Sequence, residues 1–233
     1  MKIVFVGDSI TNGKLGASFV DLISKDNRYH ITNLGHDGDT WNLIFNRLHS
    51  HLKVDQSMDC IVLQGGYNDL LLPFFQERGG LFQRAYDQQL KKGCAPVSTE
   101  EFTKMLESHI RKIKEVYHGR LILLTIGCVG EKLDSELNAK RNHFNELLIQ
   151  VAEKEKLTLV NTQIPFDAFL STSQQSSYCL DNIWAITIWD RLFKKWDALS
   201  KKRGLHLTID GVHLNTKGAA IFAESIAREL HLK

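Results

Sequence analysis

The sequence predicts an α/β fold of three layers (α/β/α), in which helices cover both faces of a flavodoxin-like, five-stranded parallel sheet. Three observations support this prediction. Short β-branched runs alternate with longer stretches whose apolar residues recur at helical spacing, which is typical of βαβ units. Most of the short runs are almost continuously apolar, as expected for strands covered on both faces. Small polar residues follow the first three runs, where strands would turn into loops.

Five segments have the length and composition of strands in such a sheet. Each is bounded by Gly, Asn or a charged turn and is rich in β-branched or other apolar residues. These segments are residues 2–6, 30–34, 59–64, 120–126 and 158–161.

Apolar stripes at helical spacing predict the helices between and after these strands. The best-marked helix opens with Ser98 and Glu101, which form a capping-box pair, and is expected to close at Gly119. Four stripes have the period of an amphipathic helix. Their apolar positions are Trp41, Ile44, Phe45, Leu48 and Leu52; Phe102, Leu106, Ile110, Ile113 and Tyr117; Leu137, Phe144, Leu147 and Val151; and Phe222, Ile226 and Leu230.

We expect residues 1–233 to form a single domain with two insertions, at about 70–97 and 165–205. The first contains an unbroken apolar run and a Gly pair, and the second contains Trp184, Trp189 and Trp196. Both are too apolar for solvated loops, so their side chains either cover the core or line a pocket.

Composition indicates an ordinary globular protein, with 43% hydrophobic and 24% charged residues. The formal net charge of +2 argues against nucleic acid or a membrane surface as the main partner and favours a small molecule. The longest apolar runs fall far short of the ~20 residues that span a bilayer, and no signal peptide is visible, so we expect a cytoplasmic protein. The sequence indicates no particular oligomeric state.

The cysteine pattern predicts free thiols. The cysteines are dispersed, with no Cys-x-x-Cys pair and no matching His spacing, so neither a metal site nor a disulfide framework is indicated. They are Cys60, Cys94, Cys128 and Cys179.

The residues that follow the strands have the chemistry of a hydrolytic centre. Runs of small polar residues at 7–11, 35–40 and 65–69 supply a hydroxyl, backbone N–H groups made accessible by Gly, and a side-chain amide. A serine nucleophile also needs a base. His213 is the best candidate, because Asp210 precedes it by three residues across a Gly-containing turn and can accept a hydrogen bond from one ring nitrogen.

Four blocks of the sequence resemble the SGNH hydrolases, also called GDSL-type esterases and lipases. The blocks are Gly-Asp-Ser at 7–9, the glycine of Gly-Asp-Thr at 38–40, Gly-Tyr-Asn-Asp at 66–69 and Asp-Gly-Val-His at 210–213. Their order along the chain matches the family, and they span nearly the whole sequence. The two insertions have no general counterpart in the family.

The resemblance implies that the protein is a serine hydrolase that cleaves carboxylic esters of small molecules through an acyl-enzyme. Ser9 would attack the carbonyl carbon, His213 would act as general base, and Asp210 would orient the imidazole. The oxyanion hole would consist of the backbone N–H groups of Ser9 and Gly38 and the side-chain amide of Asn68. The resemblance implies neither a cofactor nor a metal.

Two alternative functions remain open. One is a non-catalytic, flavodoxin-like module that binds a small molecule or an anion such as phosphate, although no Gly-x-Gly-x-x-Gly or Walker pattern supports it. The other is an acyltransferase that uses the same triad. The Gly-x-Ser-x-Gly elbow of α/β-hydrolases is absent.

Four neighbouring polar residues receive simpler interpretations. Asp8 and Asp69 are expected to stabilise turns or cap helices. His36 is expected to lie in a surface loop. His206 is a rival base, but it lacks the Asp-x-x-His frame.

Overall fold

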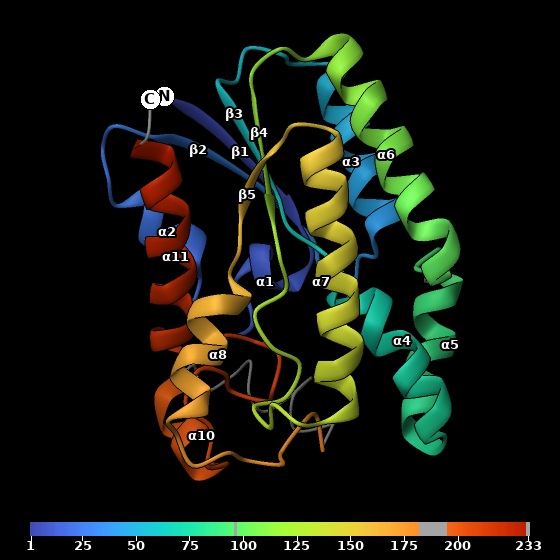
Figure 1. Cartoon of the computed structure of the whole chain (residues 1–233), viewed down its shortest axis with the longest axis vertical. Helices are drawn as coiled ribbons and strands as arrows, with labels where there is room; N and C mark the ends of the chain where they lie inside the picture. The colour runs from blue at the N-terminus through green and yellow to red at the C-terminus, as the bar shows by residue number, and fades with distance from the viewer. Residues whose placement is uncertain (96, 182–194, 232–233) are drawn as a thin grey trace.

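The computed structural model describes residues 1–95, 97–181 and 195–231 and contains a five-stranded, all-parallel sheet (Figure 1). The strand order is β2-β1-β3-β4-β5, which is the flavodoxin-like order. Every neighbouring pair is parallel. The predicted fold class is therefore confirmed. The strands are β1 (Lys2–Gly7), β2 (His30–Gly35), β3 (Cys60–Leu63), β4 (Arg120–Leu124) and β5 (Thr158–Val160).

The strands end at slightly different residues from those predicted. β1 and β2 each run one residue further, because Gly7 and Gly35 still pair with each other. β3 begins one residue later, at Cys60, and β3, β4 and β5 all end earlier, because the residues that follow them turn into loops. At the end of β4, for example, the Thr125 hydroxyl accepts a hydrogen bond from the Thr162 N–H at 2.9 Å, so the chain leaves the regular ladder there.

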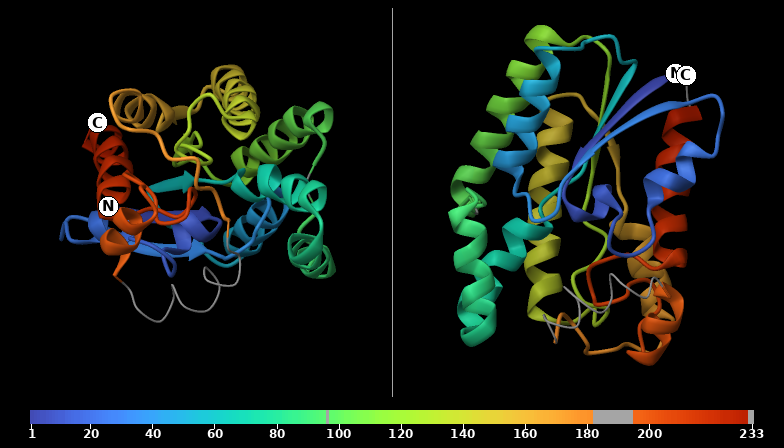
Figure 2. Two further views of the ribbon diagram at one scale, coloured as in Figure 1. Left: turned by 90° about the horizontal axis from the view of Figure 1, so that it is seen from below. Right: turned by 180° about the vertical axis from the view of Figure 1, so that it is seen from behind.

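Helices cover both faces of the sheet, as predicted (Figures 1 and 2). On one face, α2 and α11 pack together through the rings of Phe19 and Phe222, whose centroids are 5.5 Å apart. The other face carries α3, α6 and α7 in adjacent positions. The bounds are α2 (Phe19–Ser24), α3 (Trp41–Leu52), α6 (Thr99–Val116), α7 (Glu136–Lys154) and α11 (Thr216–His231).

The four apolar stripes lie on helices except for Tyr117, because α6 ends earlier than predicted. Its start is as expected, since the Ser98 hydroxyl accepts a hydrogen bond from the Glu101 N–H at 3.4 Å. The helix stops at Val116 instead of near Gly119, because Tyr117 adopts an extended backbone with φ −130°. This change of direction buries the Tyr117 side chain and leads the chain into β4.

The first insertion is largely helical. It contains most of α4 (Tyr67–Arg78), with Pro73 inside it, and α5 (Gly80–Lys91). Leu71 and Leu72 of α4 are buried, whereas α5 buries none of its side chains. The two parts of the insertion therefore differ: α4 packs on the core, and α5 does not.

The second insertion is described in part. It includes most of α8 (Gln163–Ser171), which packs against α11, and α10 (Trp196–Lys202). Trp196 is half-buried against the core. Trp184, Trp189 and Phe193 lie outside the described residues.

The cysteines are free, and three of them are buried while Cys179 is half-buried. No helix in the described ranges is long and apolar enough to cross a bilayer. Within the same ranges, no group of three or more His, Cys, Asp or Glu side chains is placed to hold a metal ion.

Candidate active site

The Ser9 side chain lies at the carboxyl edge of the sheet because β1 leads directly into a short helix. The strand ends at Gly7, Asp8 caps the helix, and Ser9 is the first residue of α1 (Ser9–Asn12). The Asp8 carboxylate accepts a hydrogen bond from the Ile10 N–H at 2.9 Å. This cap holds the turn in which Ser9 stands half-buried.

Asp210 and His213 form a rigid pair just ahead of α11. One oxygen of the buried Asp210 carboxylate accepts hydrogen bonds from the N–H groups of Val212 at 2.9 Å and His213 at 2.8 Å. The other oxygen lies 2.7 Å from His213 Nδ1. Gly211, between them, has φ +93°, a left-handed conformation that glycine adopts without a steric penalty. The turn therefore fixes the orientation of the imidazole.

The second ring nitrogen of this histidine reaches the serine. His213 Nε2 lies 3.1 Å from Ser9 Oγ, although the two residues are 204 positions apart. Carboxylate, imidazole and hydroxyl thus form one continuous hydrogen-bonded series. In such a series the imidazole can take the proton of the hydroxyl while the carboxylate stabilises the resulting positive charge.

The two ionisable groups of the pair shift each other's pKa in opposite directions. Burial alone would raise the pKa of Asp210, but the positive charge of His213 and the hydrogen bonds from His213 and Val212 lower it overall. Burial alone would lower the pKa of His213, but the Asp210 charge and hydrogen bond raise it overall. The pair therefore favours an ionised aspartate beside a histidine that accepts a proton readily.

Gly38 and Asn68 are brought together by the loop after β2 and the start of α4. The Asn68 side-chain amide donates a hydrogen bond to the backbone carbonyl of Asp39 at 2.9 Å. Gly38 is buried with φ +87°. A Cβ at Gly38 would lie 2.6 Å from Nε2 of Gln89, so α5 reaches this loop. Gln89 is a neighbour that the sequence did not indicate, because its amide stands in an unremarkable polar helix.

Two buried acids next to these residues cap helices. The Asp69 carboxylate accepts a hydrogen bond from the Trp41 N–H at 3.2 Å, at the start of α3, and Asp8 caps α1. Burial raises the pKa of each carboxyl group to about 7. These positions agree with the capping role predicted from the sequence.

The other two histidines considered as site residues point elsewhere. The side chain of His36 is 65% exposed, and its Nδ1 lies 3.0 Å from Asp39. Nε2 of His206, the rival base, lies 2.8 Å from the carbonyl oxygen of Gln174 and is engaged there.

The side chains of a serine, a histidine and an aspartate therefore meet at the carboxyl edge of the flavodoxin-like sheet, with the histidine in contact with both of the others. Residues 5–221 match the model of the GDSL-like Lipase/Acylhydrolase family, and the chain belongs to that family. The resemblance to GDSL-type enzymes inferred from the four sequence blocks is therefore confirmed, and the protein is an enzyme of the esterase and acylhydrolase class. No curated protein matches the chain in sequence.

Solved structures with a similar fold include esterases. An acetyl xylan esterase, AlAXEase, has 18% identity and a TM-score of 0.64, over 99% of this chain and 100% of that one. A catalytic mutant of an acetylxylan esterase from Geobacillus stearothermophilus has 20% identity and a TM-score of 0.65, over 100% and 94%. An α/β hydrolase enzyme, LAE5, from the metagenome of Lake Arreo, Spain, has 20% identity and a TM-score of 0.65, over 97% and 93%. These likenesses concern the fold.

Proposed function

We propose that this protein hydrolyses carboxylic esters through an acyl-enzyme formed on Ser9. The observation that carries the proposal is the series of contacts from Asp210 to His213 at 2.7 Å and from His213 to Ser9 at 3.1 Å. Binding of an anion requires no such hydrogen-bonded series of carboxylate, imidazole and hydroxyl. Its geometry suits removal of the serine proton during attack on a carbonyl carbon.

Each step of the proposed reaction uses a group at the site. Ser9 Oγ attacks the ester carbonyl while His213 Nε2 takes the hydroxyl proton. The oxyanion would accept hydrogen bonds from the N–H groups of Ser9 and Gly38 and from the Asn68 amide. His213 then donates the proton to the leaving alcohol as the C–O bond breaks. Water, deprotonated by His213, attacks the acyl-enzyme; the bond from the acyl carbon to Ser9 Oγ then breaks, His213 returns the proton to Ser9 Oγ, and the acid is released.

We propose a short acyl group on a polar alcohol as the substrate class, with acetylated carbohydrates to be tested first. Two observations support this choice. Esterases of acetylated xylan are among the proteins of similar fold. The Gln89 amide lies against Gly38, where it can form a hydrogen bond with a polar substrate. A panel of p-nitrophenyl esters of graded acyl length, measured beside acetylated xylo-oligosaccharides, tests the choice. A steady rise of kcat/KM with chain length would contradict it.

A fluorophosphonate probe tests the hydrolase mechanism directly. We expect the probe to label Ser9 alone and the Ser9→Ala variant to be neither labelled nor active on p-nitrophenyl acetate. A folded wild-type protein that is unlabelled and inert would refute the proposal and favour a binding module. Transfer of the acyl group to an added alcohol at a rate above hydrolysis would favour the acyltransferase.

A further inference from the structure

The loop that follows β4 carries a buried carboxylate, which is hydrogen-bonded to the segment just ahead of the Asp210–His213 turn. Glu131 is fully buried. Its carboxylate accepts four hydrogen bonds. Oε1 accepts hydrogen bonds from the N–H groups of Leu207 at 2.8 Å and Thr208 at 2.7 Å and from the Thr208 hydroxyl at 2.7 Å. Oε2 accepts from the His206 N–H at 2.7 Å.

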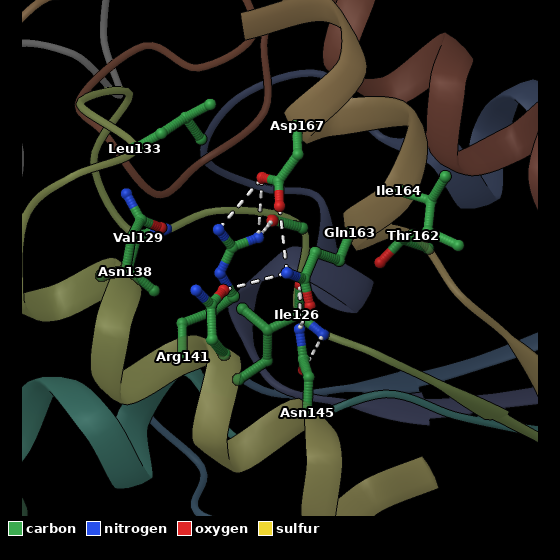
Figure 3. A network of polar contacts seen from close by, with 12 residues as sticks. Ile126, Val129, Leu133, Asn138, Arg141, Asn145, Thr162, Gln163, Ile164 and Asp167 are labelled. Carbon is green, nitrogen blue, oxygen red and sulfur yellow. Dashed lines mark hydrogen bonds and ion pairs between the residues drawn. The ribbon is translucent and has the colours of Figure 1, made fainter. Parts of the chain in front are cut away.

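The loop that carries Glu131 is fixed to helix α7 through Asn138, which Figure 3 labels beside Val129 of the loop. The buried Asn138 amide donates hydrogen bonds to the carbonyl oxygens of Gly130 at 3.0 Å and Lys132 at 2.9 Å, on either side of Glu131. Its oxygen accepts from the Val129 N–H at 3.0 Å. These bonds leave the backbone around Glu131 little freedom.

Two more α7 side chains anchor the beginning of the same loop (Figure 3). The buried Arg141 guanidinium donates to the carbonyl oxygen of Gly127 and forms an ion pair with Asp167 of α8 at 3.0 Å. Asn145 exchanges two hydrogen bonds with the backbone of Ile126, at 2.8 and 2.9 Å. The loop from β4 therefore forms a rigid support at the carboxyl edge of the sheet.

This support is bonded to the turn that carries the proposed catalytic pair. The Thr208 hydroxyl, which donates to Glu131, accepts a hydrogen bond from the Gly211 N–H at 3.1 Å. The carbonyl oxygen of Gly211 in turn accepts from the Gly130 N–H at 2.6 Å. Gly211 directly follows Asp210. Its N–H group is held by Thr208, which is bonded to Glu131, and its carbonyl oxygen is held by Gly130.

We infer that Glu131 is a positioning residue, which holds the residue 206–213 segment so that His213 Nε2 reaches Ser9 Oγ. The inference rests on the proposed function. A carboxylate suits this position because both of its oxygens accept hydrogen bonds and neither donates. In a glutamine at this position, the NH₂ group would face either the backbone N–H groups of Leu207 and Thr208 or that of His206. Two hydrogen-bond donors would then face each other. The segment would then have to move, although the size and shape of the side chain are almost unchanged.

The test compares Glu131→Gln with wild type and with Glu155→Gln. Glu155 is also a buried acid with a hydrogen-bonded partner, Arg111 at 2.9 Å, but it follows α7 near the opposite end of the sheet. We expect Glu131→Gln to lower kcat and the rate of fluorophosphonate labelling at Ser9 by about 10- to 100-fold, with KM within about twofold, because small displacements of reacting groups have effects of this size. We expect Glu155→Gln to lower the Tm without these changes.

The pH profile separates positioning from a general loss of stability. A weaker contact between Asp210 and His213 reduces the effect of the carboxylate on the imidazole, so the pKa of His213 should fall. The acid limb of kcat/KM should therefore move to lower pH in Glu131→Gln and stay in place in Glu155→Gln. A loss of folded protein would lower the amplitude of the profile and leave the limb where it is.

The outcomes distinguish this inference from the proposed function. A wild-type protein that is not labelled refutes the proposed function. If the wild-type protein is labelled and the folded Glu131→Gln variant has the same rate and pH profile, the positioning role of Glu131 is refuted while the proposed function stands. If Glu131→Gln does not fold, Thr208→Val replaces it, since valine keeps the shape but removes the hydroxyl between Glu131 and Gly211. A wild-type rate and pH profile in Thr208→Val would then overturn the inference.

Discussion

Replacement of Asp210 by Asn is the sharpest test of the proposed triad. The carboxylate has two tasks in the structure: one oxygen holds the N–H groups of Val212 and His213, and the other faces His213 Nδ1. An asparagine can perform the first task, because its carbonyl oxygen also accepts hydrogen bonds. Its NH₂ group then faces His213 Nδ1. In the wild-type protein the Nδ1–H group donates at this position, so two hydrogen-bond donors would face each other.

The expected loss follows from the tautomer that this contact selects. With an NH₂ group opposite Nδ1, His213 must accept at Nδ1 and carry its proton at Nε2, so Nε2 can no longer take the Ser9 proton. A serine hydrolase with the wrong tautomer loses a factor of about 10⁴ in kcat. This factor corresponds to about 5 kcal/mol of activation free energy. The fold should persist, since the two backbone hydrogen bonds remain.

Initial rates on p-nitrophenyl acetate and the rate of fluorophosphonate labelling measure the effect, with circular dichroism as the check on folding. Asp197→Asn is the matched control, because the Asp197 carboxylate accepts a hydrogen bond from the Thr216 N–H at 3.0 Å just beyond the same turn. We expect wild-type kinetics for the control. A folded Asp210→Asn variant within tenfold of the wild-type kcat would refute the role of Asp210.

Three further predictions concern the base, the oxyanion hole and the core. Burial lowers the pKa of His213, but its pairing with Asp210 raises it overall above the ordinary value of a histidine, so kcat/KM should decline as the pH falls through this raised pKa; a flat acid limb would exclude His213 as the base. Asn68→Ala should lower kcat by about 10²–10³ with little change in KM, and steady-state kinetics with an unchanged kcat would remove this amide from the oxyanion hole. Phe222→Ala should reduce the free energy of unfolding by about 3–5 kcal/mol in urea denaturation, because the buried ring packs against Phe19 and Phe166; a loss below about 1 kcal/mol would contradict this packing.

The regular elements were predictable because their signals are local. The stripe on α3 and the capping pair at the start of α6 depend on residues within a turn or two of each other, and both lie where expected. The strand interiors follow for the same reason, since a covered strand must be apolar along its length. The ends were less predictable: whether Tyr117 continues α6 depends on the burial of its ring, which is a tertiary contact.

The surroundings of the site were not predictable. Gln89 and Glu131 stand in polar sequences that resemble any solvated helix or turn, and nothing nearby in the chain indicates the partners they meet. α5 buries none of its side chains, yet it brings Gln89 to Gly38. Such contacts arise only when segments far apart in the chain are packed together.

Composition and spacing within a few residues predict the fold class, the order of the strand-end motifs and the short list of reactive groups. The 3.1 Å contact between His213 and Ser9 and the hydrogen bonds of Glu131 to the segment that leads to His213 follow only from the folded chain. A distance between residues 204 positions apart depends on how the sheet and the helices between them pack. Hydrogen-bond chemistry then acts only on groups that this packing has already brought within reach.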